Sequence, residues 1–179
     1  MKLSKRSQDF TQSEIRSMTK ECNKVDGINM AQGVCDLEVP PIVMQSAKEA
    51  MDNGINIYTP SEGLPELRIA IADKMKRFYD LEIDGMSEVM VSDGATGAFY
   101  TAVLSLLNPE DEVILFEPFY GYHKNVLDII GVKVKAVAIN LNDLSIDFEQ
   151  LKSVCTERTK AIIICTPNNP TGKVFSKEE

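Results

Sequence analysis

Three short stretches of the sequence carry side chains suited to holding a ligand. They are SDGATGAFY, EPFYGYH and TPNNPTG, and each follows an apolar run. In the first stretch, Ala95 and Thr96 stand where a helix is expected to begin. Backbone N–H groups at the start of a helix attract phosphate, and small residues let it approach. The alternative is a tight turn whose glycines serve only its geometry.

The second and third stretches offer a ring and an amide. Tyr120 could stack on a flat ring, and Asn169 could donate a hydrogen bond to an oxygen without carrying charge. Equally, the aromatic residues could simply cover a sheet, and Asn beside Pro is ordinary in turns. Parallel sheets bind ligands beyond the carboxyl ends of their strands. Together the stretches indicate one ligand with a phosphate, a flat ring and a polar ring oxygen.

The elements that position these stretches alternate along the second half of the chain. Apolar runs predict strands, and the segments between them predict helices, a pattern typical of parallel α/β architecture. The predicted strands are residues 88–92, 112–116, 132–139 and 160–165, and the predicted helices are 95–107, 122–130 and 147–155. Lys133 and Lys135 alternate with Val in the third strand, which favours an edge position because burying both lysines is costly.

The first half of the chain reads differently. Residues 1–25 are predicted to be partly helical, 26–41 form an irregular arm, and 42–52 and 64–78 are helices. At the other end, Ser176 and Glu179 have the spacing of a capping box, which predicts the start of another helix.

Composition excludes several classes of function. The net charge of −8 argues against a nucleic-acid partner. No apolar run is long enough to cross a membrane, and the first residues lack the apolar segment of a signal peptide. The four Cys and the single His123 have no metal-ligand spacing. We therefore expect a cytoplasmic protein with reduced thiols and no metal.

A nicotinamide-binding fold is a weaker alternative. The run from Gly94 to Gly97 is similar to the start of a dinucleotide fingerprint, and Glu117 ends the next apolar run, where a ribose-binding acid would stand. Tyr100 occupies the position where a third Gly would allow close helix packing, which counts against this alternative.

Five stretches in order resemble the class I/II pyridoxal-phosphate aminotransferases of fold type I. They are NMAQGVCDLEVP, YTPSEGLPELRIAIA, SDGATGAFY, EPFYGYH and TPNNPTG. The resemblance implies a three-layer α/β/α large domain with an incomplete, mostly parallel sheet. Residues 1–41 would be an N-terminal helix and arm. Residues 42–179 would be the N-terminal part of the domain that binds pyridoxal 5′-phosphate, without its C-terminal part or the small domain.

The resemblance also implies roles for six residues. Ala95 and Thr96 would hold the cofactor phosphate, and Tyr120 would stack on the pyridine ring. Asn169 would hydrogen-bond the 3′ oxygen of that ring. The remaining two positions are Gly33, beside the substrate carboxylate, and Tyr58, reaching the partner's cofactor phosphate in a homodimer.

The family's Schiff-base Lys and the acid beside the pyridinium nitrogen would lie beyond the chain end. Lys160, Lys173 and Lys177 lack the family's context for that Lys. We expect an amino-acid and 2-oxo-acid transaminase of ping-pong type as the parent protein, and an inactive isolated chain. A C–S β-lyase of aminotransferase type, or a non-catalytic fragment, would share the same motifs.

The family's strand order adds an expectation about the sheet. The run 88–92 would have no neighbouring strand in this chain. The other three would pair, with 132–139 on the outside and one side of 160–165 exposed.

Overall fold

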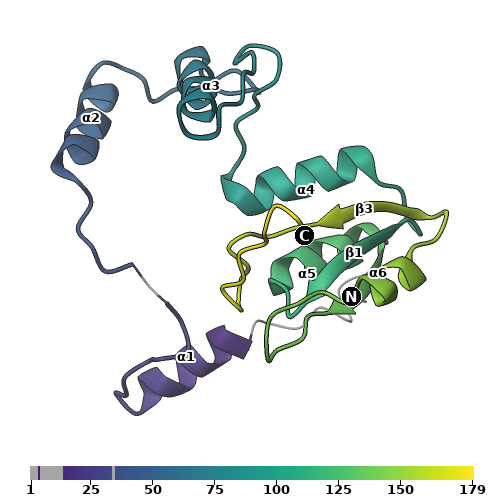
Figure 1. Ribbon diagram of the computed structural model, residues 1–179. Helices are drawn as coiled ribbons and strands as arrows, with labels where there is room; N and C mark the ends of the chain where they lie inside the picture. Colours follow the sequence, from purple (N-terminus) through teal and green to yellow (C-terminus); the bar gives the residue numbers. More distant parts are fainter. Residues whose placement is uncertain (1–3, 5–13, 34) are drawn as a thin grey trace. The chain divides into compact units, whose positions relative to one another are not determined.

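The computed structural model describes residues 4, 14–33 and 35–179 (Figure 1). The chain divides into two compact units. One spans Glu14–Gly94, and the other combines Met1–Ser13 with Ala95–Glu179. The first contains the helices α1 (Glu14–Lys24), α2 (Pro41–Asp52) and α3 (Pro65–Tyr79). Between α1 and α2 the described residues form no helix or strand, as expected of the predicted arm. The predicted structure of residues 1–13 lies, except at residue 4, outside the described residues.

The second unit is an α/β structure, with α4 beginning at the junction of the two units. Its elements are α4 (Gly94–Leu106), β1 (Glu112–Glu117), α5 (Gly121–Ile130), β2 (Lys133–Ala138), α6 (Phe148–Val154) and β3 (Thr159–Ile163). The strands pair in parallel in the order β2-β1-β3. The Lys-bearing strand β2 therefore lies at the edge, which confirms the prediction made from its alternating lysines.

The central strand β1 is buried on both faces because its side chains alternate between two hydrophobic clusters. Val113 and Leu115 pack with side chains of α4 and α5, including Val103 and Leu127. Ile114 and Phe116 point to the other face, where side chains of α6 cover them. Helices thus cover both faces of the sheet (Figure 1), in the three-layer arrangement expected from the sequence.

Strand β3 is covered less completely. Ala161 and Ile163 pack against the cluster that α4 and α5 cover. On the other face Ile162 is 45% exposed, and beyond the strand Ile164 is 60% exposed. Within the described residues β3 also has no strand on its outer side. The expectation of an open side on this strand is confirmed.

Helix boundaries follow local chemistry. Pro41 and Pro65 occupy the first positions of α2 and α3, where a missing N–H has no cost. Asp147 caps α6 by accepting hydrogen bonds from two backbone N–H groups. Gly131 ends α5 at φ 83°, a left-handed conformation that glycine adopts readily. The five helices predicted between residues 42 and 155 are present. At residues 176–179 the predicted capping box forms its hydrogen bonds, but these residues are not helical.

The predicted strand at residues 88–92 is not formed, so that prediction is wrong. The backbone of this segment bonds to other groups of the first unit instead of to a strand. The Val91 N–H donates to the Glu62 carbonyl at 2.9 Å, and the Val89 carbonyl accepts from Nε of the buried Arg68 at 2.8 Å. A strand needs a ladder partner, and among the described residues no strand pairs with this run.

A buried carboxylate ties together the amino-terminal end of the sheet. Glu112, at the start of β1, is only 1% exposed. Its Oε2 accepts from the Thr156 hydroxyl at 2.6 Å, and its Oε1 accepts from the Arg158 guanidinium at 2.9 Å. The Nζ of Lys135, on β2, lies 3.5 Å from the same Oε1. These contacts hold the pKa of Glu112 below its ordinary value, the Thr156 hydrogen bond being the main cause.

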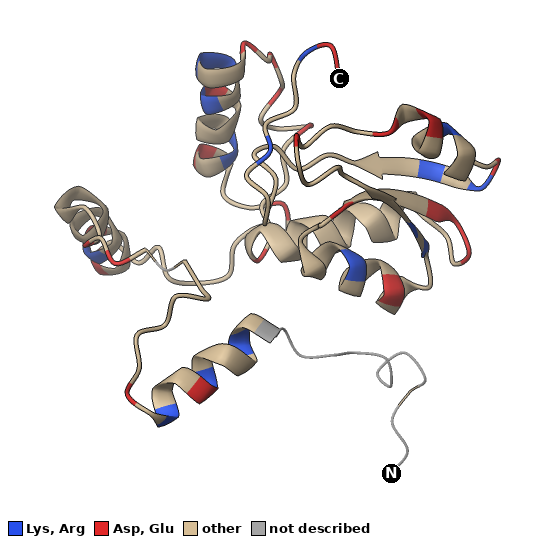
Figure 2. Cartoon of the chain, turned by 60° about the horizontal axis from the view of Figure 1, so that its bottom comes forward, with Lys and Arg blue, Asp and Glu red and all other residues tan. Residues whose placement is uncertain are grey.

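Charges of both signs are interspersed along the described helices other than α4, which carries none (Figure 2). This mixed distribution is unlike the clustered basic surface that a phosphate backbone needs. Among the described residues, no helix combines the length and the apolar character needed to cross a bilayer.

Candidate active site

The carboxyl ends of β1 and β3 are joined by one side chain. Asn168, in the turn after β3, is buried at 7% exposure. Its Nδ2 donates to the Pro118 carbonyl at 3.0 Å and to the Thr171 hydroxyl at 2.8 Å. Pro118 belongs to the segment that leaves β1 and leads to Tyr120. The structure therefore brings two of the predicted ligand-binding stretches together.

Asn168 also closes its own turn through the backbone. Its N–H donates to the Lys173 carbonyl at 2.8 Å, and its carbonyl accepts from the Gly172 N–H at 2.7 Å. Gly172 has φ 73°, which favours glycine at this point of the turn. Peptide bonds Thr166-Pro167 and Asn169-Pro170 are cis. The two backbone hydrogen bonds of Asn168 thus close a short turn that contains Asn169.

The two neighbouring asparagines have different environments. Asn169 is exposed, and among the residues that the structure describes its side chain has no hydrogen-bond partner. Its amide donors are therefore available to a ligand. Asn168, in contrast, has satisfied donors and a structural task that we did not predict from the sequence.

Tyr120 lies in the segment that leaves β1, directly before α5. Its side chain is 36% exposed. Its ring packs against that of Tyr122, with centroids 5.2 Å apart, and edge-on against His123 at 5.5 Å. These contacts support the ring from its own helix and leave part of it accessible for stacking.

The imidazole of His123 connects Tyr120 to α4. Its centroid lies 4.7 Å from that of Phe99, which follows Thr96 on α4. Burial lowers the pKa of His123, so the ring is neutral at pH 7. Sequence reasoning considered this residue only as a metal ligand. Its spacing of three from Tyr120, across the start of a predicted helix, was the signal that could have found it.

The start of α4 has the features of an anion site. Ala95 and Thr96 are exposed small residues in its first turn, which contains no acid. The first N–H groups of any helix lack partners within it, and the helix dipole favours negative charge there. Gly94 enters the helix at φ 70°, and no atom lies within 4 Å of where a Cβ would stand on it.

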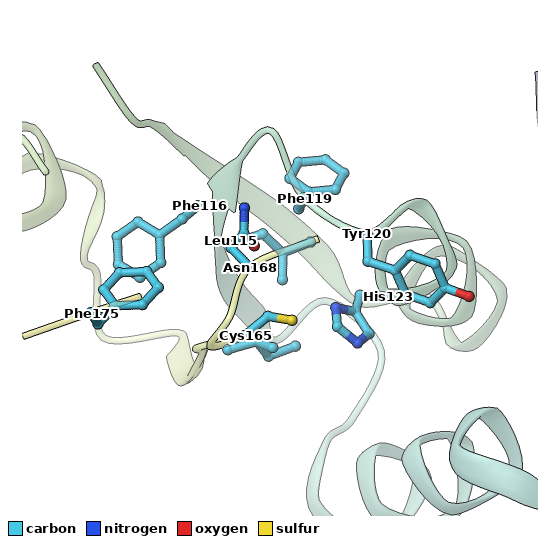
Figure 3. Close-up of a pocket in the computed structure, with 9 residues that line it drawn as sticks. Leu115, Phe116, Phe119, Tyr120, His123, Cys165, Asn168 and Phe175 are labelled. Carbon is cyan, nitrogen blue, oxygen red and sulfur yellow. The ribbon is translucent and has the colours of Figure 1, made fainter. Parts of the chain in front are cut away.

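A small hollow lies at the carboxyl ends of β1 and β3 (Figure 3). Tyr120, His123, Cys165 and Asn168 are among the residues that line it. Its volume of about 10 Å³ is the size needed for one water. The hollow is therefore too small to enclose a ligand that carries a ring and a phosphate.

The other two predicted site residues belong to the first unit. Gly33 is exposed, and open space surrounds the place where a Cβ would stand. Tyr58 is fully exposed. Their roles at the substrate and at a partner's cofactor stay predictions.

The lysines near the carboxyl end of the chain do not line the hollow. Lys173 is 7% exposed, and its Nζ lies 2.6 Å from Glu179 Oε1. The Nζ of Lys160 donates to the Glu157 carbonyl, and Lys177 is exposed. None of the three lines the hollow beside Tyr120.

Residues 25–179 match the family described as aminotransferase class I and II. The chain belongs to this family. Class I and II aminotransferases use pyridoxal phosphate, and the groups at this end of the sheet fit that cofactor. Helix N–H groups can take a phosphate, the Tyr120 ring a pyridine face, and the Asn169 amide a ring oxygen. Family membership favours this interpretation over the nicotinamide alternative.

Relatives of this aminotransferase chain carry several names. It is 37% identical over 164 residues to a probable N-succinyldiaminopimelate aminotransferase of Mycobacterium tuberculosis, covering 90% of this chain and 41% of the relative. It is 36% identical over 185 residues to the aspartate aminotransferase of Bacillus subtilis, covering 100% of this chain and 47% of the relative. The chain thus spans less than half the length of these curated relatives.

Solved structures give the same result for the fold. The N-succinyldiaminopimelate aminotransferase structure from Mycobacterium tuberculosis matches with a TM-score of 0.92 at 34% identity, over 99% of this chain and 47% of that one. The Thermus thermophilus aspartate aminotransferase with maleate matches with a TM-score of 0.91 at 30% identity, over 99% and 48%. The fold-type expectation is confirmed.

Proposed function

We propose that this chain is the amino-terminal portion of an enzyme that transfers an amino group from an L-amino acid to a 2-oxo acid. The transfer takes two half-reactions of ping-pong type. The observation that carries the proposal is the junction made by Asn168. It joins the segment bearing Tyr120 to the turn bearing Asn169 at one end of the sheet. Family membership supports the choice of reaction.

When bound, pyridoxal phosphate supplies an electron sink that lets the α-hydrogen of an amino acid leave as a proton. The residues of this chain bind and orient it. Ala95 and Thr96 present N–H and hydroxyl donors to the phosphate, and Tyr120 limits ring tilt by stacking. The Asn169 amide donates to the ring oxygen, which favours the charged form of that oxygen.

In this proposal, the other functional groups of the active site do not come from the second unit. The covalent Lys, the acid beside the ring nitrogen and the Arg that binds the substrate carboxylate are expected from a further portion of the protein. Gly33 is proposed to lie beside the substrate carboxylate, and Tyr58 to reach the cofactor phosphate of the other subunit in a homodimer. The two relatives are both called aminotransferases, which supports transamination over C–S lyase chemistry, although their names differ in substrate.

The test compares the full-length protein with the isolated chain. Purified full-length protein, supplied with pyridoxal phosphate and a panel of amino-acid and 2-oxo-acid pairs, should convert at least one pair. The isolated chain should convert none in the same coupled assay. Release of pyruvate and a thiol from a cysteine conjugate would instead indicate C–S β-lyase activity and would contradict the proposed transamination. Turnover by the isolated chain would refute the assignment of the covalent Lys to another portion.

Binding gives an independent readout. Asn169→Ala in the full-length protein should weaken pyridoxal-phosphate affinity by about tenfold, the effect of losing one hydrogen bond to a charged oxygen. An unchanged dissociation constant, measured by titrating cofactor-free protein and following visible absorbance, would remove Asn169 from the site.

A further inference from the structure

Lys173 is in an unusual place for a lysine. It is buried, whereas lysines are almost never buried without a partner. Its Nζ lies 2.6 Å from Glu179 Oε1 and 5.0 Å from the centre of the Phe175 ring. Burying an ammonium group costs free energy that one good ion pair offsets only in part. Such a pair is therefore weak support for stability and suggests another task.

The backbone of Lys173 closes the turn that carries Asn169. Its carbonyl accepts from the Asn168 N–H at 2.8 Å, and its N–H donates to the Thr171 hydroxyl at 3.3 Å. The same residue is thus attached twice. Its main chain holds the turn, and its side chain is fixed beyond the turn by Glu179.

Glu179 is itself held in place. Its Oε2 accepts from the Ser176 N–H at 2.8 Å, and the Ser176 hydroxyl accepts from the Glu179 N–H at 3.2 Å. This reciprocal pair is the capping box expected from the sequence. Hydrogen bonds, first of all from Lys173, lower the pKa of Glu179, so it is charged at neutral pH. The carboxylate that meets Lys173 is therefore fixed in position and ionised.

Asn169 depends on this frame. Because its side chain has no partner among the described residues, the turn's backbone is the part of the structure that fixes the place from which the amide reaches out. A useful hydrogen bond tolerates only small errors in distance and angle. A site residue of this kind needs a rigid support.

We propose that the ion pair between the buried Lys173 and the partly exposed Glu179 is a positioning device that fixes the turn so that Asn169 meets the ring oxygen of the cofactor. The inference rests on the proposed function, because it takes Asn169 as a cofactor contact. Neither residue of the pair touches the cofactor in this account. They act through the 168–173 turn.

The experiment uses the full-length protein and two variants that each remove one charge. Lys173→Met and Glu179→Gln should each weaken pyridoxal-phosphate affinity by about tenfold, as a misaligned hydrogen bond does. Lys152→Met is the matched control, because Lys152 also pairs with a carboxylate, Glu149, at 2.8 Å but on the exposed surface. It should leave affinity unchanged. If Lys173→Met does not fold, Glu179→Gln carries the test.

A double-mutant cycle separates positioning from general stability. In an Asn169→Ala background, either charge-removing variant should cause little further loss of affinity, since the amide that it positions is gone. The pH midpoint of the bound cofactor's visible absorbance should move in the same direction in Asn169→Ala, Lys173→Met and Glu179→Gln. An equal loss of affinity with and without Asn169 would overturn the proposal.

The same measurements also distinguish a failure of the positioning role from a failure of the proposed function. If Asn169→Ala weakens affinity while Lys173→Met and Glu179→Gln do not, the positioning role is wrong and the cofactor contact stands. If Asn169→Ala has no effect, the contact itself is wrong, and the positioning role is refuted with it.

Discussion

Asn168 Nδ2 donates a hydrogen bond to the carbonyl oxygen of Pro118 at 3.0 Å, across fifty positions of sequence. This bond connects the exits of β1 and β3. Because Asn168 is buried, its loss leaves polar partners without compensation.

Asn168→Ala should therefore destabilise the protein by about 1–3 kcal/mol, the cost of unsatisfied buried partners. Thermal or urea unfolding measures this change. Asn142→Ala serves as the control, because Asn142 is exposed. Equal unfolding midpoints for the two variants would contradict the structural role of Asn168.

Tyr120 should contribute to cofactor binding through its ring and not through its hydroxyl. Tyr120→Phe keeps the ring and its packing against His123, so affinity should stay close to that of the unchanged protein. Tyr120→Ala should weaken affinity by about tenfold through lost stacking. Cofactor titration of the two variants decides, and the prediction is wrong if Phe and Ala behave alike.

Glu112 should make the stability of the folded protein depend on pH. Its pKa is lowered in the folded protein from an ordinary value of 4.5, so its contribution is complete above that value. The contribution is lost as pH falls through the lower, folded pKa. Glu112→Gln should lower the melting temperature most at neutral pH, with the gap narrowing on acidification. Melting curves from about pH 7 to about pH 3 test this. A gap that stays constant would show that the charge of Glu112 is not responsible.

Leu127 should be the sensitive position of the core between β1, α4 and α5. It is 0% exposed, and Leu→Ala at such sites costs about 2–5 kcal/mol. Leu106→Ala is a matched control on α4, because Leu106 is 77% exposed. Its effect should stay within about 0.5 kcal/mol. Urea unfolding of both variants provides the measurement, and similar losses would argue against the described core.

Local patterns predicted most of the second unit. The helix positions and the edge location of β2 follow from apolar periodicity and from alternating lysines, which depend on the residues themselves. The failed strand at 88–92 had the same apolar character as β1. Residues 88–92 form no strand because a strand requires a hydrogen-bonded partner strand. Their backbone groups instead form hydrogen bonds with the Arg68 side chain and the Glu62 carbonyl.

The motifs of the candidate site could be predicted from the sequence, but the contacts that hold its residues in place could not. Asn169 was selected by family resemblance, while the burial of Asn168 became visible only in three dimensions. From the sequence, His123 was excluded as a metal ligand and Lys173 as the Schiff-base Lys, and no other role was predicted for either residue. The contacts of His123 with Tyr120 and of Lys173 with Glu179 are local in the sequence. The packing of His123 against Phe99 on α4 and the burial of Lys173 depend instead on the folded structure.

The two ends of β1 have separate tasks. The Glu112 cluster lies at one end, and the segment bearing Tyr120 leaves the other. An engineer could therefore screen libraries around Glu112 for thermal tolerance while varying the opposite loops to change cofactor affinity. Because the length of the strand separates the two sets of positions, gains from the two campaigns should combine additively.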